Sequence, residues 1–225
     1  MKSFNEIYDR VKTRKGGEAT VRSLLPDNIL SREELQAVPD ECFLAEMTKA
    51  VFKAGFVWKV VDHKWPAFET AFWQFDVKHC ASMNHYDLDN LLKNDGIIKN
   101  LQKIDTVPKN AAMILKVAED HGSFAGFIAD WPDNDFIGLL AFLKINGGRL
   151  GPQTAQHFLR QVGRDGFMLG KDGVAALIDC GVINKPPTSK SDMKAIQDAF
   201  NHWCAETGLN NAKISKILAL SVSSR

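Results

Sequence analysis

The chain has few residues of the two types that most often bind transition metals. Its 225 residues include four cysteines and six histidines. The histidines lack the spacing of a metal site, and no two cysteines lie within four residues of each other; the cysteines are Cys42, Cys80, Cys180 and Cys204. This spacing argues against zinc knuckles and clustered iron–sulfur ligands. We expect no metal, no cofactor, and single thiols in a reducing compartment.

Long apolar segments are also missing. No stretch approaches the roughly 20 apolar residues of a membrane span, and the N-terminal residues contain no apolar core of a signal peptide. We therefore expect a soluble, intracellular protein with no membrane partner.

A strong excess of one charge is absent as well. The formal net charge is +1, which is not the basic footprint of a typical nucleic-acid binder. Residues 141–225 nevertheless hold 11 Lys and Arg against six Asp and Glu. If the protein meets a polyanion, this part should face it. Chance variation explains the asymmetry equally well.

The apolar residues recur mainly at spacings of three and four, which is typical of helices, and no segment alternates like a strand. The sequence therefore predicts an all-α fold of about ten short helices, without repeats, in a single domain over residues 1–225. The expected helices cover residues 1–15, 31–37, 42–54, 58–63, 67–74, 87–94, 98–121 (bent or interrupted at Pro108), 123–130, 135–145, 152–162, 173–179, 189–207 and 212–221.

A helical hairpin is predicted over residues 139–162. Gly147 and Gly148 can adopt positive φ and end the first helix, and Pro152 suits the first position of the second helix. A glycine-rich turn that leads into a helix N-terminus presents backbone N–H groups to an anion such as phosphate. A plain helical hairpin with glycines at its turn fits the same spacing.

The hairpin sequence GGRLGPQTA (147–155) resembles that of the helix-hairpin-helix DNA glycosylase superfamily, L-P-G-V-G-P-K-T-A. Arg149 stands where that superfamily has the first glycine of the turn. Gln153 replaces the lysine that bifunctional members use as a nucleophile, so no Schiff base can form. The resemblance implies a two-lobed all-α fold, a monofunctional glycosylase, and a phosphate grip at Gly147, Gly148, Arg149, Gly151, Gln153 and Thr154.

In that superfamily a catalytic aspartate follows the hairpin by about twenty residues, at the start of the next helix. Asp172 occupies this place, 21 residues after Gly151, whereas Asp165 lies too near the preceding helix. A carboxylate stabilises the oxocarbenium-like sugar of C–N cleavage or orients the attacking water. An aspartate at a helix start is also a common N-cap, and the two roles can coexist.

Residues 43–104 resemble the bacterial DNA-3-methyladenine glycosylase I family, with a segment A-G-L-S-W, then F-x-x-F-D, then G-I-I-R-x-x-x-K-I. The matching residues are Ala54-Gly55, Trp58, Phe72, Phe75-Asp76, Gly96-Ile97-Ile98-Lys99 and Lys103-Ile104. Trp58 matches the base-stacking tryptophan; packing in the core is its alternative role. Phe52, Phe56 and Trp65 are candidates for further walls of the base pocket, with Phe52 and Phe56 four apart on one helix face. Core packing suits them equally well.

Two features depart from that family. Its base-recognising glutamate corresponds to Ala50 here, and Glu46, one turn earlier on the same face, is the only nearby carboxylate. The family's Cys/His zinc site has no counterpart in residues 1–41, which contain no Cys or His. We therefore expect a divergent N-terminal segment and no metal.

The resemblance implies that the chain hydrolyses the N-glycosidic bond of alkylated purines, chiefly 3-methyladenine, in base excision repair. Its partner would be double-stranded DNA with alkylated bases, and we expect a monomer in the bacterial cytoplasm. Two alternatives remain: a DNA-binding protein that has kept the hairpin without cleavage, and an all-α protein unrelated to DNA.

Overall fold

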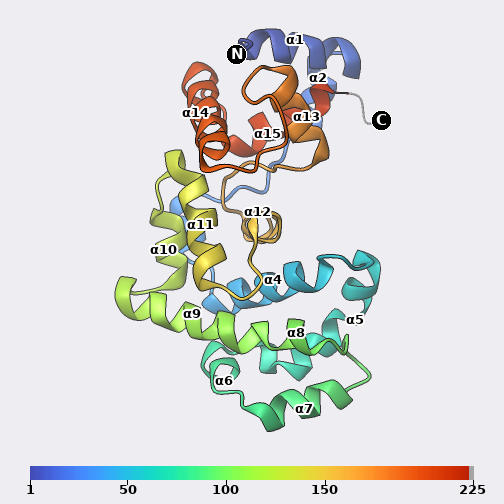
Figure 1. Ribbon diagram of the computed structural model, residues 1–225, viewed down its shortest axis with the longest axis vertical. Coiled ribbons are helices and arrows are strands. Elements are labelled where there is room, and N and C mark those ends of the chain that lie inside the picture. The colour runs from blue at the N-terminus through green and yellow to red at the C-terminus, as the bar shows by residue number, and fades with distance from the viewer. Residues whose placement is uncertain (223–225) are drawn as a thin grey trace. The chain divides into compact units, whose positions relative to one another are not determined.

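The computed structural model describes residues 1–222, and these residues form helices joined by turns and loops, with no strand among them (Figure 1). The predicted all-α fold is confirmed. The elements are α1 (Phe4–Lys15), α2 (Glu18–Ser23), α3 (Arg32–Gln36), α4 (Asp40–Lys53), α5 (Trp58–Ala71), η1 (Trp73–Phe75), α6 (Val77–Ala81), α7 (His85–Lys93), α8 (Leu101–Ile104), α9 (Thr106–His121), α10 (Phe124–Asp130), η2 (Asp133–Asp135), α11 (Phe136–Asn146), α12 (Pro152–Gln161), α13 (Lys171–Asp179), α14 (Lys190–Thr207) and α15 (Asn211–Ser221).

The chain divides into two compact units, and neither is a continuous stretch of sequence. The first unit comprises residues 1–29, 132–138 and 165–222, and the second comprises residues 30–131 and 139–164. The description as a single domain stays a prediction. No helix within residues 1–222 has both the length and the apolar character needed to cross a bilayer.

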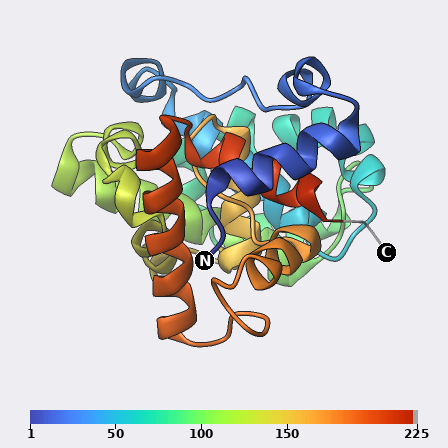
Figure 2. The same ribbon diagram turned by 90° about the horizontal axis from the view of Figure 1, so that it is seen from above.

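In the first unit the N-terminal helix packs against the last one. Figure 2 shows α1 lying alongside α15, and the two helices are in contact. The Lys2 backbone N–H donates to Cys180 O over 3.0 Å, and the Arg14 guanidinium donates to Ser221 O, also over 3.0 Å. In the same unit Phe167 stacks on Phe200, with ring centroids 4.1 Å apart. Residues more than 160 positions apart in sequence therefore meet in this unit.

In the second unit α4 is central and packs against α5, α9 and α12 (Figure 1). Its buried Phe43 meets Phe124 and Phe158 edge-on, with ring centroids 5.4 and 6.2 Å apart. The amphipathic pattern over residues 42–54 thus places its apolar face in the core, as a helix of that periodicity requires.

Helix α5 differs from expectation. The proline at position 66 predicts two helices, yet one helix runs from Trp58 to Ala71 through Pro66. An interior proline costs a helix about 3 kcal/mol. Val61 and Phe68, on either side of the proline, are both fully buried, and this packing offsets the loss.

The helix predicted over residues 98–121 begins later and is interrupted at Asp105 rather than at Pro108. The Thr106 hydroxyl donates to Lys103 O over 2.6 Å, which occupies a carbonyl at the end of α8. Pro108 falls at the third residue of α9, where a backbone N–H has no acceptor within the helix. The proline therefore does not disturb α9.

Candidate active site

The turn of the hairpin connects α11 to α12 and differs from the expected geometry. Arg149 has a φ of +59°, whereas Gly147 and Gly148 are not left-handed, so the expectation of positive φ at these glycines is wrong. The two glycines instead allow close packing. A Cβ atom at Gly147 would lie 2.5 Å from Leu150 Cδ1, and one at Gly148 would lie 3.1 Å from Thr106 Cβ.

The protein itself already uses two N–H groups of the turn. Gly147 N–H donates to Leu143 O over 2.9 Å, and Gly148 N–H donates to Asn110 Oδ1 over 2.6 Å. Donors for an anion therefore remain at the N-terminus of α12. There the backbone N–H groups of Gln153 and Thr154 have no acceptor within the helix, and no side chain in the described part of the chain caps this end.

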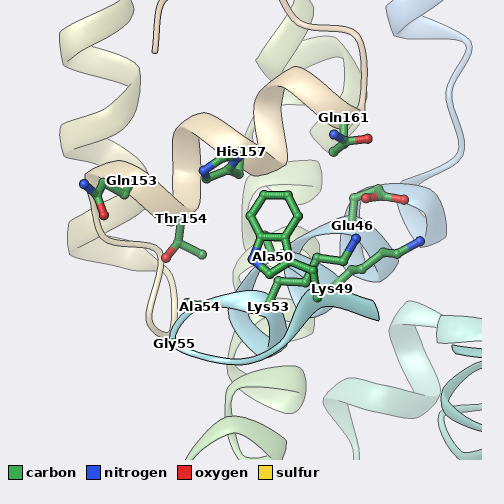
Figure 3. Close-up of a pocket in the computed structure, with 11 residues that line it drawn as sticks. Glu46, Lys49, Ala50, Lys53, Ala54, Gly55, Gln153, Thr154, His157 and Gln161 are labelled. Carbon is green, nitrogen blue, oxygen red and sulfur yellow. The ribbon is translucent and has the colours of Figure 1, made fainter. Parts of the chain in front are cut away.

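A cleft of about 280 Å³ lies in the second unit, between α4 and the start of α5 on one side and α12 on the other. Figure 3 shows side chains from α4 and α12 facing one another across it. The cleft brings together four predicted site residues, Glu46, Trp58, Gln153 and Thr154, which lie up to 108 positions apart in sequence. Its other lining residues are Lys49, Ala50, Lys53, Ala54, Gly55, His157 and Gln161.

Trp58 is the first residue of α5, and its side chain is 49% exposed. The His157 ring meets it edge to face, with the centroids 5.3 Å apart and the planes at 89°. Lys53 Nζ lies 5.2 Å from the indole centroid and 2.7 Å from Asp62 Oδ1. Trp58 is thus accessible but held in place on two sides, which suits a platform for a flat ligand.

The cleft contains one carboxylate and one imidazole with shifted acidities. Burial raises the pKa of Glu46, although Lys49 and Lys53 act against this shift. Burial, together with Arg160 and Lys53, lowers the pKa of His157. His157 is therefore mainly neutral at pH 7 and offers one hydrogen-bond donor and one acceptor.

The other predicted wall residues lie elsewhere. Phe52 is fully buried and meets Phe68 edge-on at 4.7 Å, and Trp65 stacks on Phe68 and Phe75 at 5.5 and 5.4 Å. Neither lines the cleft. The expectation that Phe52 and Phe56 share a helix face is wrong because α4 ends at Lys53, and Phe56 lies in the following turn, 45% exposed.

The two aspartates after the hairpin, both in the first unit, have different surroundings. Asp165 accepts hydrogen bonds from the backbone N–H groups of Asn211 and Ala212, each over 2.9 Å. It therefore anchors the start of α15. Asp172 is the second residue of α13 and is partly buried, and the residue that caps this helix is Gly170. A carboxylate in the first helical turn is favoured by the helix dipole.

Sequence reasoning missed His157 and Lys53. The polar side chains of Gln153, His157 and Gln161 recur every four residues along α12, which marks a shared helix face; this signal was available. Lys53 offers no such signal, because its contact with Trp58 depends on the angle at which the chain turns between α4 and α5. Within residues 1–222, no group of three or more His, Cys, Asp or Glu side chains is arranged to hold a metal ion.

Comparison with known proteins identifies related sequences and folds. Residues 38–139 match the methyladenine glycosylase family. The DNA-3-methyladenine glycosylase of Haemophilus influenzae is 34% identical over 76 residues, which make up 34% of this chain and 41% of that protein. The chain thus aligns with less than half the length of this curated relative.

Two solved structures share the fold. 3-Methyladenine DNA glycosylase I from Staphylococcus aureus has a TM-score of 0.50 and 24% identity, over 55% of this chain and 76% of that chain. The 8-oxoguanine DNA glycosylase of Methanocaldococcus jannaschii has a TM-score of 0.57 and 15% identity, over 94% of this chain and 91% of that chain. These findings confirm the predicted all-α fold and the resemblance to methyladenine glycosylases predicted from residues 43–104.

Proposed function

We propose that this chain, which matches the methyladenine glycosylases over residues 38–139, is a monofunctional DNA glycosylase. It hydrolyses the N-glycosidic bond of an alkylated purine, chiefly 3-methyladenine, in double-stranded DNA, and acts as a monomer in the bacterial cytoplasm. One observation carries the proposal: a single cleft joins the accessible Trp58 and the carboxylate of Glu46 to the free N-terminus of α12.

The proposed DNA contact is made by the hairpin. The N–H groups of Gln153 and Thr154, at the positive end of the α12 dipole, bind a backbone phosphate. Because these donors carry no formal charge, they suit a protein whose net charge is only +1. Arg149, at the tip of the turn, adds one positive side chain close to the same phosphate.

The flipped base stacks on Trp58. A 3-methyladenine still attached to its sugar is a cation, so the indole face attracts it by about 0.5–2 kcal/mol beyond ordinary stacking. In its ionised form Glu46 adds a favourable charge at the wall of the cleft, one helical turn before Ala50. The neutral form of His157 adds no repulsion.

Asp172 is the proposed catalytic carboxylate. Water attacks C1′ of the sugar, the C1′–N bond breaks, and its electron pair neutralises the departing cationic base. Asp172 stabilises the positive sugar and orients the water, whose proton passes to bulk solvent. Since the leaving base is already positive, no strong general acid is needed. Gln153 has no amine with which to form a Schiff base, so no strand cleavage follows.

Release of free 3-methyladenine from methylated duplex DNA tests the proposal. Asp172→Asn is expected to abolish release while duplex affinity is kept. Asp179→Asn serves as the matched control, because Asp179 lies at the other end of α13 and pairs with Lys2 and Arg10 on the surface. Full activity in Asp172→Asn would show that the assigned role is wrong.

A second candidate is a DNA-binding protein that does not cleave. It is favoured by one observation: the methyl group of Ala50 lines the cleft at the place of the family's base-recognising glutamate. Duplex binding by the wild-type protein without any base release would support this candidate.

A further inference from the structure

Lys103 is a buried lysine that interacts with the end of another helix. Its side chain is 8% exposed, and Nζ donates to Phe52 O over 3.0 Å and to Ala54 O over 2.7 Å. The same amine lies 5.4 Å from the centroid of the Phe56 ring. Lys103 thus satisfies carbonyls at the C-terminus of α4, where the chain turns toward Trp58.

Asn110, seven residues later, interacts with the hairpin in a similar way. It is fully buried; Oδ1 accepts from Gly148 N–H over 2.6 Å and Nδ2 donates to Gly148 O over 3.3 Å. Both polar groups of one backbone residue are therefore fixed by one side chain. The next residue, Arg149, is left-handed, which costs a residue other than glycine about 1–2 kcal/mol.

Both side chains belong to one short stretch, α8 and the first turns of α9, in the same compact unit as the cleft. Neither lines the cleft. Each directs its hydrogen bonds to a backbone turn that leads to a different part of the proposed site: one to the base platform, the other to the phosphate grip. Buried polar groups that are fully paired hold a single geometry.

We infer that Lys103 and Asn110 are two separate positioning residues, Lys103 for the turn that carries Trp58 and Asn110 for the turn that leads to the anion-binding end of α12. This inference rests on the proposed function. It makes the affinity for the base depend on Lys103 and the affinity for DNA depend on Asn110, although neither side chain lines the cleft.

The full-length protein with Lys103→Met or Asn110→Ala tests this assignment. Calorimetry with free 3-methyladenine measures base binding, and titration of a duplex with a tetrahydrofuran abasic-site analogue measures DNA binding. We expect Lys103→Met to weaken base binding about tenfold with little change for the duplex, and Asn110→Ala to do the reverse. A residue that only stabilised the fold would lower the melting temperature without separating the two affinities.

Lys109→Met and Asn201→Ala are matched controls. Lys109 pairs with Asp105 at the surface, and Asn201 Nδ2 donates to Asn134 O over 3.0 Å in the first unit. Both controls are expected to keep both affinities. Lys103→Arg retains a cationic donor, and Asn110→Asp retains the acceptor for Gly148 N–H. Both should therefore recover part of the affinity that is lost in Lys103→Met and Asn110→Ala. If one of those two variants does not fold, the conservative variant takes its place.

The outcomes separate the two proposals. If the wild-type protein binds both ligands and each variant loses both equally, or neither, the inference is overturned while the proposed function stands. If the wild-type protein binds neither 3-methyladenine nor the duplex, the proposed function fails and the inference with it. The inference is supported if Lys103→Met loses affinity mainly for 3-methyladenine and Asn110→Ala loses affinity mainly for the duplex.

Discussion

Replacing Arg149 by glycine should raise stability and weaken DNA binding at the same time. Arg149 holds a φ of +59°, a conformation that costs a side-chain-bearing residue about 1–2 kcal/mol. Glycine removes this cost but adds about 0.5–1 kcal/mol of backbone entropy to the unfolded state. The net gain is about 0.5–1 kcal/mol, which corresponds to a rise of roughly 1–4 °C in the melting temperature of a chain of this size.

The loss of the guanidinium acts on DNA binding. One phosphate contact fewer reduces the slope of log affinity against log salt by about 0.9. Differential scanning calorimetry measures the first effect, and fluorescence anisotropy with a labelled duplex at several salt concentrations measures the second. Arg149→Lys is the control: it keeps both the charge and the strained backbone, so neither quantity should change much.

Two results would refute this reasoning. A lower melting temperature in Arg149→Gly would mean that the contact between the guanidinium and Gln102 outweighs the backbone strain. If the slope of log affinity against log salt is unchanged in Arg149→Gly, the Arg149 side chain does not contact a phosphate, and the proposed contact is made by the backbone N–H groups of α12 alone.

Two further predictions concern the carboxylates. Burial raises the pKa of Glu46, so the affinity for a cationic base should fall as the pH drops through that raised value, since the carboxylate becomes neutral. Glu46→Gln should weaken binding of 3,9-dimethyladeninium about tenfold at pH 7. In calorimetric titrations this variant should no longer lose affinity as the pH falls. If it still does, a different titratable group causes the pH dependence. Asp165→Ala should lower the free energy of unfolding by about 2–3 kcal/mol, because buried N–H groups at the start of α15 lose their acceptor, but duplex affinity per folded molecule should stay the same in urea and binding titrations. A change in affinity without destabilisation would contradict its anchoring role.

The helix ends could be predicted where a local signal decides them. Ser31 followed three residues later by Glu34 is a capping-box pattern that predicts a helix start; the structure has this capping box, and α3 begins directly after Ser31. The helix across Pro66 and the break at Asp105 could not be predicted in this way. Both depend on which side chains become buried or find a backbone acceptor, and such contacts form only when distant segments meet.

The same division holds for the site. Trp58, Gln153 and Thr154 were predicted from the resemblance of short motifs, and Glu46 as the carboxylate nearest to Ala50; all four line one cleft. Phe52 lies within α4 and is fully buried, whereas Trp58 begins α5 and is exposed, and aromatic character alone could not distinguish the two environments. The four-residue spacing of Gln153, His157 and Gln161 could have indicated His157, whereas the contact of Lys53 with Trp58 depends on how the chain turns between α4 and α5.

The contact between α1 and α15 has a consequence for how the protein is made. Arg14 donates to Ser221 O, a partner 207 residues further along the chain. At translation rates of about 5–20 residues per second, α1 is exposed for roughly 10–40 s before α15 has been synthesised. During that time the apolar side chains of Phe4, Ile7 and Val11, all buried in the finished fold, have no native partner on α15. Helix α1 is thus synthesised long before its partner α15, and during that interval its exposed apolar face is a candidate site for chaperone binding.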